Sequence, residues 1–371
     1  MFLEFNYNNS FNYILFRIFI YLFRHILRDY FNEYFLNKNF SLLLMFLSES
    51  LAIFFFLLIK KYLIQKNKRE TVFQIRNINQ IENLISKKRS LFYIIIIIGF
   101  CGILDLINSI DYEKYFNYNF QNQITFLNII KNLFYISILF VIENIFLNKP
   151  NYRHHYLGFF LCFISLILLF FQYSYKNIKL DIAIFFIYFE YGFLFSSFVL
   201  IEKKLNFDYF IDIYFICTIE GIIGGIFAFL YIYLIKDPIY LYIKTMFNKF
   251  DIKYIIVISF DCLITLFYNI SRLKIIEKNR PSYNSIANIL ANFLICIYEY
   301  FYKNKKDNII HYILSLLFAI FGCFIFAEVI VLHFCNLDKY TFDITYKRGI
   351  NEMKQMNKDI ENEKEESVIL N

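Results

Sequence analysis

The residues with the clearest potential for chemistry are charged side chains inside long apolar stretches. Lys131 lies within ITFLNIIKNLFYISILFVI, a run that contains no other charged residue. A charge inside hydrocarbon costs about 2.5–3.5 kcal/mol on insertion scales, so it usually faces a bundle interior or a water-filled cavity. An ammonium group there could bind an anionic or carbonyl-bearing ligand, or it could form a structural ion pair with Glu49, Asp105 or Glu190. Both interpretations stay open from the sequence.

Acidic residues also occur within or near the apolar stretches. Glu49 and Glu190 lie deepest. Each is a candidate counter-ion for the lysine or a proton-carrying coupling group, because a carboxyl group in a low-dielectric interior can hold a proton. Asp105, Glu299 and Glu328 lie closer to expected helix ends, where lipid headgroups accommodate charge.

Three asparagines form a stripe in the last third of the chain. Asn284, Asn288 and Asn292 recur every four residues and therefore share one face of a helix. Such a stripe could line a pathway and bind hydroxyl or amide groups. Alternatively, it could make helix–helix hydrogen bonds, which contribute about 0.6 kcal/mol per contact in membranes.

A pair of apolar stretches recurs along the chain at a fixed offset. Within residues 128–156, eight of the 29 positions are identical to those 156 residues later, against roughly three expected by chance. The matches include Asn132 with Asn288 and Glu143 with Glu299. Each copy holds an apolar helix, a short polar turn and a second apolar helix. A duplicated pair of membrane helices is typical of transporters built from internal repeats.

Composition indicates the class of protein that holds these residues. Of 371 residues, 59% are hydrophobic and 22% are aromatic, an apolar share above that of ordinary soluble domains. Several apolar runs approach the ~20 residues that a helix needs to cross the hydrocarbon core. We therefore expect an all-α integral membrane protein in the lipid bilayer, with ten transmembrane helices arranged as two inverted five-helix repeats.

Four regions divide the chain. Residues 1–35 form an N-terminal segment, in which 10–30 are either a weak first span or an amphipathic helix on the membrane surface. The first repeat, helices 2–5, covers 36–175, the second, helices 6–10, covers 176–334, and a charged tail covers 335–371. The remaining helices are expected at about 40–59, 90–110, 124–142, 155–172, 181–201, 209–235, 253–271, 284–302 and 310–332.

Basic residues in the connecting segments predict the orientation. One side holds 23 Lys and Arg residues and the other holds 11, and the richer side should face the cytosol. The C-terminus lies on the richer side, so we expect it to be cytosolic. Most Lys and Arg residues lie in these connecting segments and not in one patch. The formal charge of +7 therefore reflects membrane topology, and we expect no nucleic-acid partner.

Motifs of common enzymes and of nucleotide or metal sites are absent from the sequence. There is no G-x-x-x-x-G-K-[ST] loop, no H-E-x-x-H and no G-x-S-x-G. For the adjacent His154 and His155, beside Arg153, an interfacial position is favoured over metal ligation. The seven cysteines lie mostly in apolar runs without C-x-x-C spacing, which favours a packing role. We expect no catalytic residue, no metal and no cofactor.

Four local patterns carry a resemblance to a known family. They are FLSESLAIFFFLL, ILDLINS, NIIKNLFYISILFVIENIFLNKPNYRHHYLG and SSFVLIEKKLNFDYFIDIYFICTIEGIIGG, in that order. Over about residues 40–332 the chain resembles the drug/metabolite transporter superfamily, and most of all solute carrier family 35, subfamily F, relatives of the nucleotide-sugar transporters. The resemblance implies that Lys131 matches the family's basic residue in helix 4, Asn128 its amide partner and Glu49 the acid of helix 2. It also favours an internal organelle over the plasma membrane.

The expected function is secondary-active transport of a small polar or anionic organic metabolite by alternating access, with proton coupling or exchange as open mechanisms. The candidate substrate-binding residues are Lys131, Asn128, Asn284, Asn288 and Asn292. The candidate coupling or counter-ion residues are Glu49 and Glu190. The alternative is a non-transporting multi-pass membrane scaffold or receptor. The expected partners are a small-molecule solute and the lipid bilayer, and a homodimer remains open.

Overall fold

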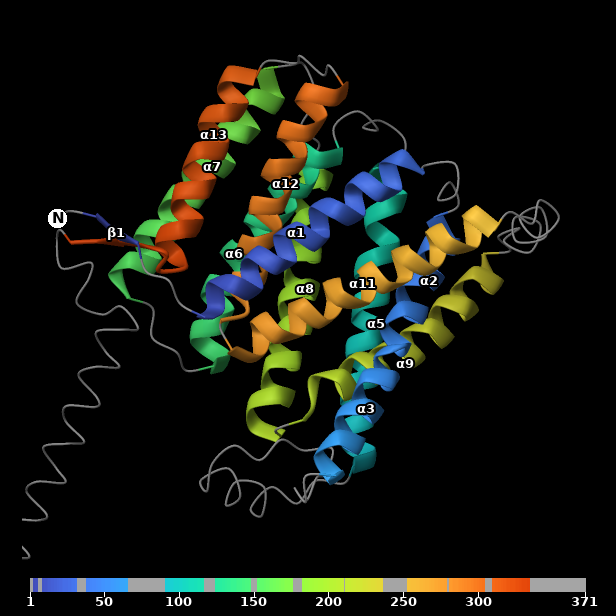
Figure 1. The fold of residues 1–371 in the computed structure, drawn as a ribbon. Coiled ribbons are helices and arrows are strands. Elements are labelled where there is room, and N and C mark those ends of the chain that lie inside the picture. The colour runs from blue at the N-terminus through green and yellow to red at the C-terminus, as the bar shows by residue number, and fades with distance from the viewer. Residues whose placement is uncertain are drawn as a thin grey trace, which may run out of the picture.

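The structure is a computed structural model, which describes residues 3–5, 9–31, 38–65, 91–116, 124–147, 152–175, 182–209, 211–235, 252–278, 280–303 and 309–333. Almost all of these residues are helical, so the helical part of the expected fold class is confirmed (Figure 1). The first half contains α1 (Asn9–Tyr30), α2 (Lys38–Ser50), α3 (Ala52–Gln65), α5 (Leu91–Phe116), α6 (Ile124–Leu147) and α7 (Arg153–Tyr175). The second half contains α8 (Ile182–Tyr209), α9 (Ile213–Leu234), α11 (Ile252–Lys278), α12 (Ser282–Lys303) and α13 (Ile309–Phe326).

Five helical segments in the described part of the chain are long and apolar enough to cross a membrane. They are Asn39–Ile59, Phe92–Ile110, Ile129–Phe146, Ile213–Leu234 and Ile252–Lys278. Two shorter apolar helices cover Arg153–Leu169 and Ile313–Phe326. This set of helices is compatible with a multi-pass membrane protein.

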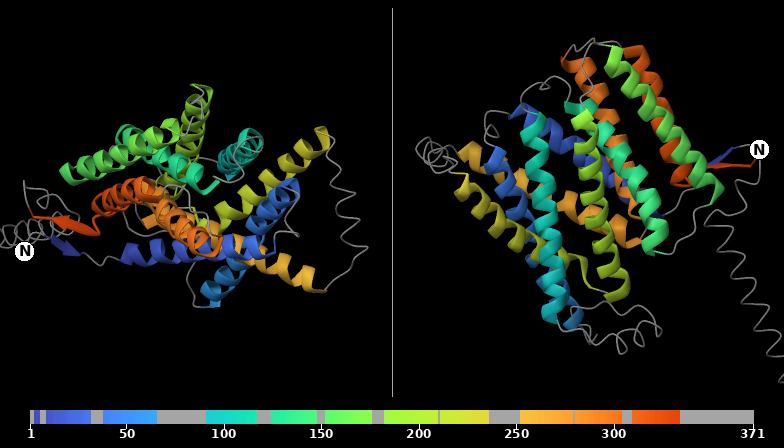
Figure 2. Two further views of the ribbon diagram at one scale, coloured as in Figure 1. Left: turned by 90° about the horizontal axis from the view of Figure 1, so that it is seen from above. Right: turned by 180° about the vertical axis from the view of Figure 1, so that it is seen from behind.

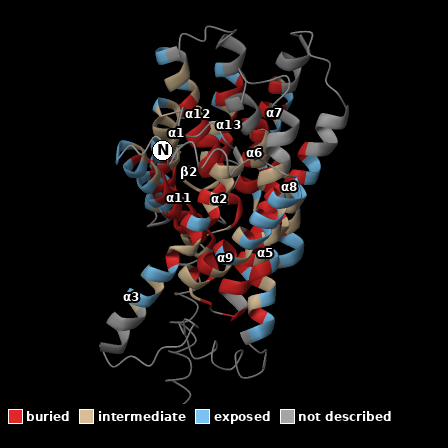
Figure 3. Ribbon diagram, turned by 90° about the vertical axis from the view of Figure 1, so that its right-hand side faces the viewer, coloured by how far each residue is buried: buried red, intermediate tan, exposed pale blue. Residues whose placement is uncertain are grey.

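Burial is distributed in the opposite way to that of a soluble domain. Large apolar side chains on outer helix faces are exposed, with Phe19 at 66%, Phe92 at 72% and Phe229 at 62%. Charged side chains such as Glu49 and Glu220 are buried, and buried residues concentrate where helices face one another (Figure 3). Charged residues are almost never fully buried in soluble proteins, whereas in membranes they turn towards the bundle interior. The distribution therefore fits a bundle solvated by lipid.

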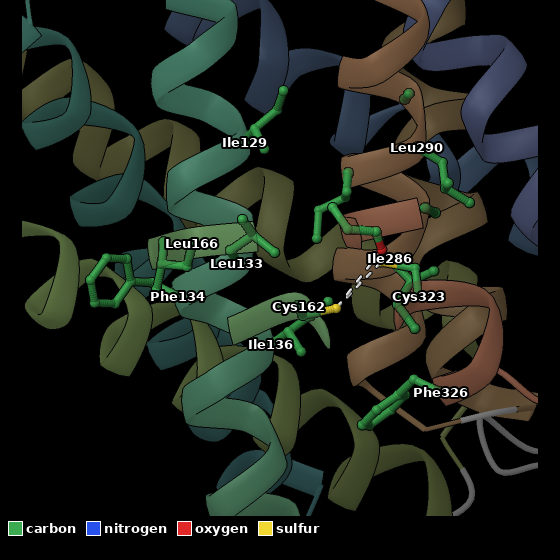
Figure 4. Packing of buried hydrophobic residues seen from close by; sticks show 14 of the residues in the cluster. Ile129, Leu133, Phe134, Ile136, Cys162, Leu166, Ile286, Leu290, Cys323 and Phe326 are labelled. Carbon is green, nitrogen blue, oxygen red and sulfur yellow. Dashed lines mark hydrogen bonds between the residues drawn. The ribbon is translucent and has the colours of Figure 1, made fainter. Parts of the chain in front are cut away.

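Two apolar cores hold the bundle together. The first lies mainly between α6, α7, α12 and α13, with Leu133, Ile286 and Phe326 among its members (Figure 4). The second lies mainly between α5, α8, α9 and α11 and includes Phe198 and Ile216. Aromatic and branched apolar side chains fill both cores, as the composition predicts.

Helices α6 and α12, the first helices of the two repeat copies, pack against each other and run antiparallel. Near the end of α6, Glu143 Oε1 accepts a 2.6 Å hydrogen bond from the backbone N–H of Ser282, at the start of α12. Further back in α6, Asn132 Oδ1 accepts a 3.4 Å hydrogen bond from Nδ2 of Asn288, further along α12. The contacts thus advance in opposite directions along the two helices.

Helices α7 and α13 lie side by side (Figure 1) and run antiparallel, and a glycine of each lies at their contact. A Cβ on Gly158 would lie 2.7 Å from the carbonyl oxygen of Gly322, and the reverse distance is also 2.7 Å. One turn further on, Cys162 Sγ lies 3.9 Å from the carbonyl oxygen of Ala319. Backbones this close leave no room for any side chain at the crossing.

A third antiparallel contact joins α2 to α9. Gly221 packs against the backbone of Ser50, and Gly224 packs against the ring of Phe46, one turn earlier in α2. Just after Ser50 the helix expected at about 40–59 is interrupted, because Leu51 forms a turn between α2 and α3.

The two ends of the described chain meet in a short antiparallel strand pair, β1 (Leu3–Phe5) and β2 (Ile330–Leu332). Figures 1 and 2 show this pair beyond the end of α13, with α1 crossing α11 and α12. The expectation of an all-α chain missed the strands, since three residues are too few for an alternating pattern.

Candidate functional site

A buried arginine of α11 joins acidic side chains from three other helices. The side chain of Arg272 is 6% exposed. Its Nη2 lies 2.9 Å from Glu202 Oε1 of α8 and 3.3 Å from Glu220 Oε2 of α9, and its Nη1 lies 3.7 Å from Asp105 Oδ2 of α5. The guanidinium also lies 4.5 Å above the ring of Phe198. One cation therefore links α5, α8, α9 and α11.

Local interactions position Arg272. Asp261, Asn269 and Arg272 lie on the buried stripe of α11, where residues three, four or eight apart share a face. At the end of this helix, Lys203 Nζ of α8 donates to the carbonyl oxygens of Ile276 at 2.6 Å and Glu277 at 3.1 Å. A lysine that binds the last carbonyls of a helix is favourably placed for its dipole.

Glu49 extends the acidic group towards α2. Its side chain is fully buried, and its Oε1 accepts a 2.7 Å hydrogen bond from Nδ2 of Asn269 on α11. Its charge interacts with those of Asp105 and Arg272. The expected helix 2 acid therefore lies in the interior of the bundle.

Lys131 of α6 lies at the edge of the same group. Its Nζ is 5.3 Å from the ring centre of Tyr135 and 5.7 Å from that of Tyr191 on α8, both within cation–π range. Asp105 is the acid that interacts with its charge. Asp105 itself, expected near the headgroups, is 8% exposed because α5 continues to Phe116.

These residues form an ion cluster of four carboxyl groups and two cations, and the charges of Arg17 and Arg24 on α1 also act on Glu202 and Glu49. Its members are Glu49, Asp105, Glu202, Glu220, Arg272 and Lys131. Buried polar atoms are usually hydrogen-bonded. Within the described residues, Glu49 Oε2, Glu220 Oε1 and Arg272 Nε make no hydrogen bond. The cluster can therefore take up a proton or further polar groups.

The asparagine stripe of α12 makes helix–helix hydrogen bonds. Asn288 Oδ1 accepts from Arg17 Nε at 3.2 Å and from the Tyr268 hydroxyl at 3.3 Å. Asn292 Nδ2 donates to the backbone oxygen of Asn288 at 2.8 Å, and its Oδ1 accepts from the Tyr21 hydroxyl at 3.4 Å. Two of the three asparagines thus serve the packing of α1, α11 and α12.

The other two predicted amide positions differ from this pattern. Asn284 is fully buried, and neither polar atom of its side chain makes a hydrogen bond in the described part of the structure. Asn128 belongs to α6, but its side chain lies outside the described residues. Glu190 has an exposed side chain on α8 and lies outside the ion cluster, so of the two candidate coupling or counter-ion residues only Glu49 belongs to the cluster.

Helix α1 brings further cations to the second half. Arg17 is 1% exposed and donates from Nη1 to the Tyr268 carbonyl oxygen at 2.7 Å. Arg28 makes a two-point contact with Asp261, at 2.9 and 2.8 Å. One basic face of α1 therefore packs against α11, which anchors the helix in the bundle.

Sequence reasoning missed Arg272 and Glu202 as site residues. Both lie beyond the expected helix ends at 271 and 201, whereas α11 continues to Lys278 and α8 to Tyr209. The signal was available in α11, because Ile270, Leu273 and Ile276 continue its apolar periodicity past Arg272. Comparison with family models and with curated protein sequences finds no match to this chain.

Proposed function

We propose that the protein is a secondary-active transporter that moves a small polar or anionic organic metabolite by alternating access. The ion cluster in the interior of an otherwise apolar bundle carries this proposal. Ionisable groups inside a membrane are costly and are typically part of solute pathways or proton relays. Lys131, flanked by Tyr135 and Tyr191, is the group suited to an anionic or carbonyl-bearing part of the solute.

The crowding of carboxyl groups around one guanidinium fits coupling to protons. Asp105, Glu202 and Glu220 share the single guanidinium of Arg272, and an incompletely compensated charge is strongly unfavourable in the interior. Protons held by Glu49 or Glu220 would remove that imbalance. Proton exchange with a solute would then change the charge of the cluster between the two faces of the membrane.

Contacts between equivalent helices support two inverted five-helix halves. Asn132 and Asn288, which are equivalent in the repeat, hydrogen-bond to each other. A residue contacts its own counterpart only close to an axis that relates two copies. Antiparallel contacts between α6 and α12, and between α7 and α13, agree with copies threaded in opposite senses.

The other helices of the two halves can be matched in chain order: α1 with α8, α2 with α9 and α5 with α11. Their contacts then also occur in equivalent pairs. Helix α1 contacts α11 and α12, and α8 contacts α5 and α6, their counterparts. Helix α2 contacts α11, and α9 contacts α5. We propose ten spans on this basis, the five apolar segments joined by α1, α7, α8, α12 and α13.

The orientation stays a proposal as well. Arg272 and Lys203 are buried within α11 and α8 and do not belong to connecting segments, which leaves 21 basic residues against 11. The C-terminus would therefore still face the cytosol.

A non-transporting scaffold or receptor is the second candidate. The hydrogen bonds of Asn288 and Asn292 favour it, because these side chains stabilise helix contacts instead of lining a path. In that case the ion cluster would only hold four helices together.

Solute flux separates the two functions. The protein would be reconstituted in liposomes that contain a pH-sensitive dye, and pools of isotopically labelled metabolites would be added under an imposed pH gradient. We expect at least one pool to enter and to change the internal pH. Absence of flux for every pool, with protein that is folded by circular dichroism, would favour the scaffold.

Two variants link flux to the site. We expect Lys131→Ala to abolish uptake while the protein stays folded, because the substitution removes the proposed solute contact. Glu190→Gln is the matched control on the exposed face of α8 and should leave uptake unchanged. Unchanged transport by Lys131→Ala would remove the lysine from the site.

A further inference from the structure

Two histidines and one carboxylate converge where α7 begins and α13 ends. His154 Nε2 lies 2.9 Å from Glu328 Oε1 and 3.2 Å from His155 Nε2, and His155 Nε2 lies 3.8 Å from the same oxygen. The histidines are 4% and 1% exposed. Among the described residues, these three form the group of histidine, cysteine or acidic side chains whose ligand atoms lie close enough together to bind one metal ion.

Hydrogen bonding alone does not account for these distances. A ring nitrogen of imidazole has one in-plane direction, in which it either donates or accepts a hydrogen bond. Nε2 of His154, however, has two polar atoms at hydrogen-bonding distance, Glu328 Oε1 and His155 Nε2. Only one of these contacts can be a hydrogen bond, whichever tautomer is present. A cation bound by all three atoms removes this conflict.

The spacing of the three atoms fits a tetrahedral metal ion. With metal–ligand bonds of about 2.0–2.2 Å, neighbouring ligand atoms of a tetrahedron are separated by about 3.3–3.6 Å. The three separations of 2.9, 3.2 and 3.8 Å lie on both sides of this range. Two imidazole nitrogens and a carboxylate oxygen are also a common three-residue ligand set of zinc.

The backbone at Glu328 supplies an independent indication. After α13, the N–H of Val329 donates to the Phe324 oxygen at 2.9 Å and that of Glu328 to the Ile325 oxygen at 3.1 Å, the bonding pattern of a Schellman motif. This motif needs a left-handed residue, usually glycine, yet Glu328 has a φ of 57°. A glutamate in that conformation is unfavourable, unless its side chain contributes an interaction that glycine lacks.

The surroundings indicate a site that binds a metal but does not depend on it for folding. His155 Nδ1 accepts a 3.1 Å hydrogen bond from the backbone N–H of Tyr152, which leaves the proton of the neutral ring on Nε2. Coordination moves that proton to Nδ1 and breaks this hydrogen bond. The charge of Arg280, which interacts with His155, also opposes a cation. Both effects lower the affinity below that of a four-ligand structural site.

We propose that His154, His155 and Glu328 bind one divalent transition-metal ion of the Zn²⁺ type, with a fourth position open to water. The ion would fix the start of α7 to the end of α13, next to the strand pair β1–β2. This site is separate from the ion cluster, and the proposal does not depend on transport. Nitrogen and carboxylate ligands favour zinc, cobalt, nickel or copper over calcium and magnesium.

Metal binding by the full-length protein in detergent micelles tests the proposal. Zn²⁺ would be titrated in competition with a chromophoric chelator, and Co²⁺ would replace it so that visible absorption reports the geometry and ligands. We expect one ion per chain, a tetrahedral Co²⁺ spectrum without thiolate absorption, and a melting temperature that rises with Zn²⁺. Glu328→Gln should weaken binding by more than about 10-fold, a loss that even outer-shell substitutions cause.

A second variant and a control keep the result decisive. His154→Gln/His155→Gln should also remove the bound ion and the rise in melting temperature. His25→Gln is the control, because His25 also contacts a carboxylate, Glu299 at 3.9 Å, but does not belong to the three-residue group where α7 begins and α13 ends. Retention of the ion by both ligand variants, thiolate absorption in the Co²⁺ form, or equal loss in the control would each overturn the proposal.

Discussion

Replacing Arg272 by glutamine is the perturbation that the structure makes most informative. Arg272 lies within 3.7 Å of three carboxylates from three helices, and its side chain is 6% exposed. Glutamine keeps part of the aliphatic stem but removes the positive charge. The acidic side chains would then face one another in the interior without the guanidinium between them.

The magnitude follows from the burial of the partners. Removing one partner from a buried ion pair typically costs about 3–5 kcal/mol, because the other charge is left uncompensated. Glu202 and Glu220 are 0% and 1% exposed, so we expect a loss in this range for Arg272→Gln. Lys274→Gln is the control, since Lys274 is 25% exposed and pairs at 3.2 Å with a single carboxylate, that of Glu277, so its loss should be smaller than that of Arg272→Gln.

Reversible unfolding in mixed micelles, followed by circular dichroism, measures both variants on the same scale. A second substitution, Glu220→Gln, should recover part of the loss in the Arg272→Gln background, because it removes one of the uncompensated charges. Contacting residues typically show interaction energies of about 0.5–3 kcal/mol in such cycles. If Arg272→Gln cost no more than Lys274→Gln, or if the two substitutions were additive, the electrostatic account of the ion cluster would be refuted.

Three further substitutions test the packing of the bundle by the same unfolding assay. Gly322→Val should destabilise the fold by about 1–3 kcal/mol, since its Cβ would lie 2.7 Å from a backbone oxygen of α7. The control Gly225→Ala should cost nothing, because the atom nearest to its Cβ would lie at 3.5 Å, an ordinary contact distance. Asp261→Asn should cost about 1–3 kcal/mol by weakening the two-point contact with Arg28, and an unchanged stability would contradict that role. Asn288→Leu should cost a similar amount, about 1–3 kcal/mol, because Arg17 Nε loses its acceptor; a stabilised variant would show that this hydrogen bond is dispensable.

Much of the helical framework could be predicted from the sequence because apolar runs of membrane length leave a strong signal. The repeat of 156 residues also identified Asn132 and Asn288 as equivalent, and these two side chains meet in the fold. The helix ends were harder to predict. Charged residues within the last two turns of α8 and α11 look like loop residues, although Glu202 and Arg272 are buried there.

The partners within the site could not be predicted, for a different reason. Lys131 stood out as an isolated charge, but the acid that it meets depends on how α5 and α6 cross. Glu190 and Tyr191 are neighbours in sequence, yet one side chain is exposed and the other is buried, because successive residues of an α-helix lie about 100° apart and the rotation of α8 about its axis decides which of them faces inward. Which residues face the interior of a bundle depends on how each helix is rotated about its axis. The sequence does not define that rotation here, because the helices are apolar on all faces.

Accessibility of position 131 from the two sides of the membrane tests the central claim most directly. Lys131→Cys would be introduced into a chain whose seven native cysteines are replaced, and a membrane-impermeant thiol reagent would be applied to each face of sealed, oriented vesicles. Alternating access predicts labelling from both faces. Labelling from neither face, or from one face only under all conditions, would contradict transport through this part of the bundle.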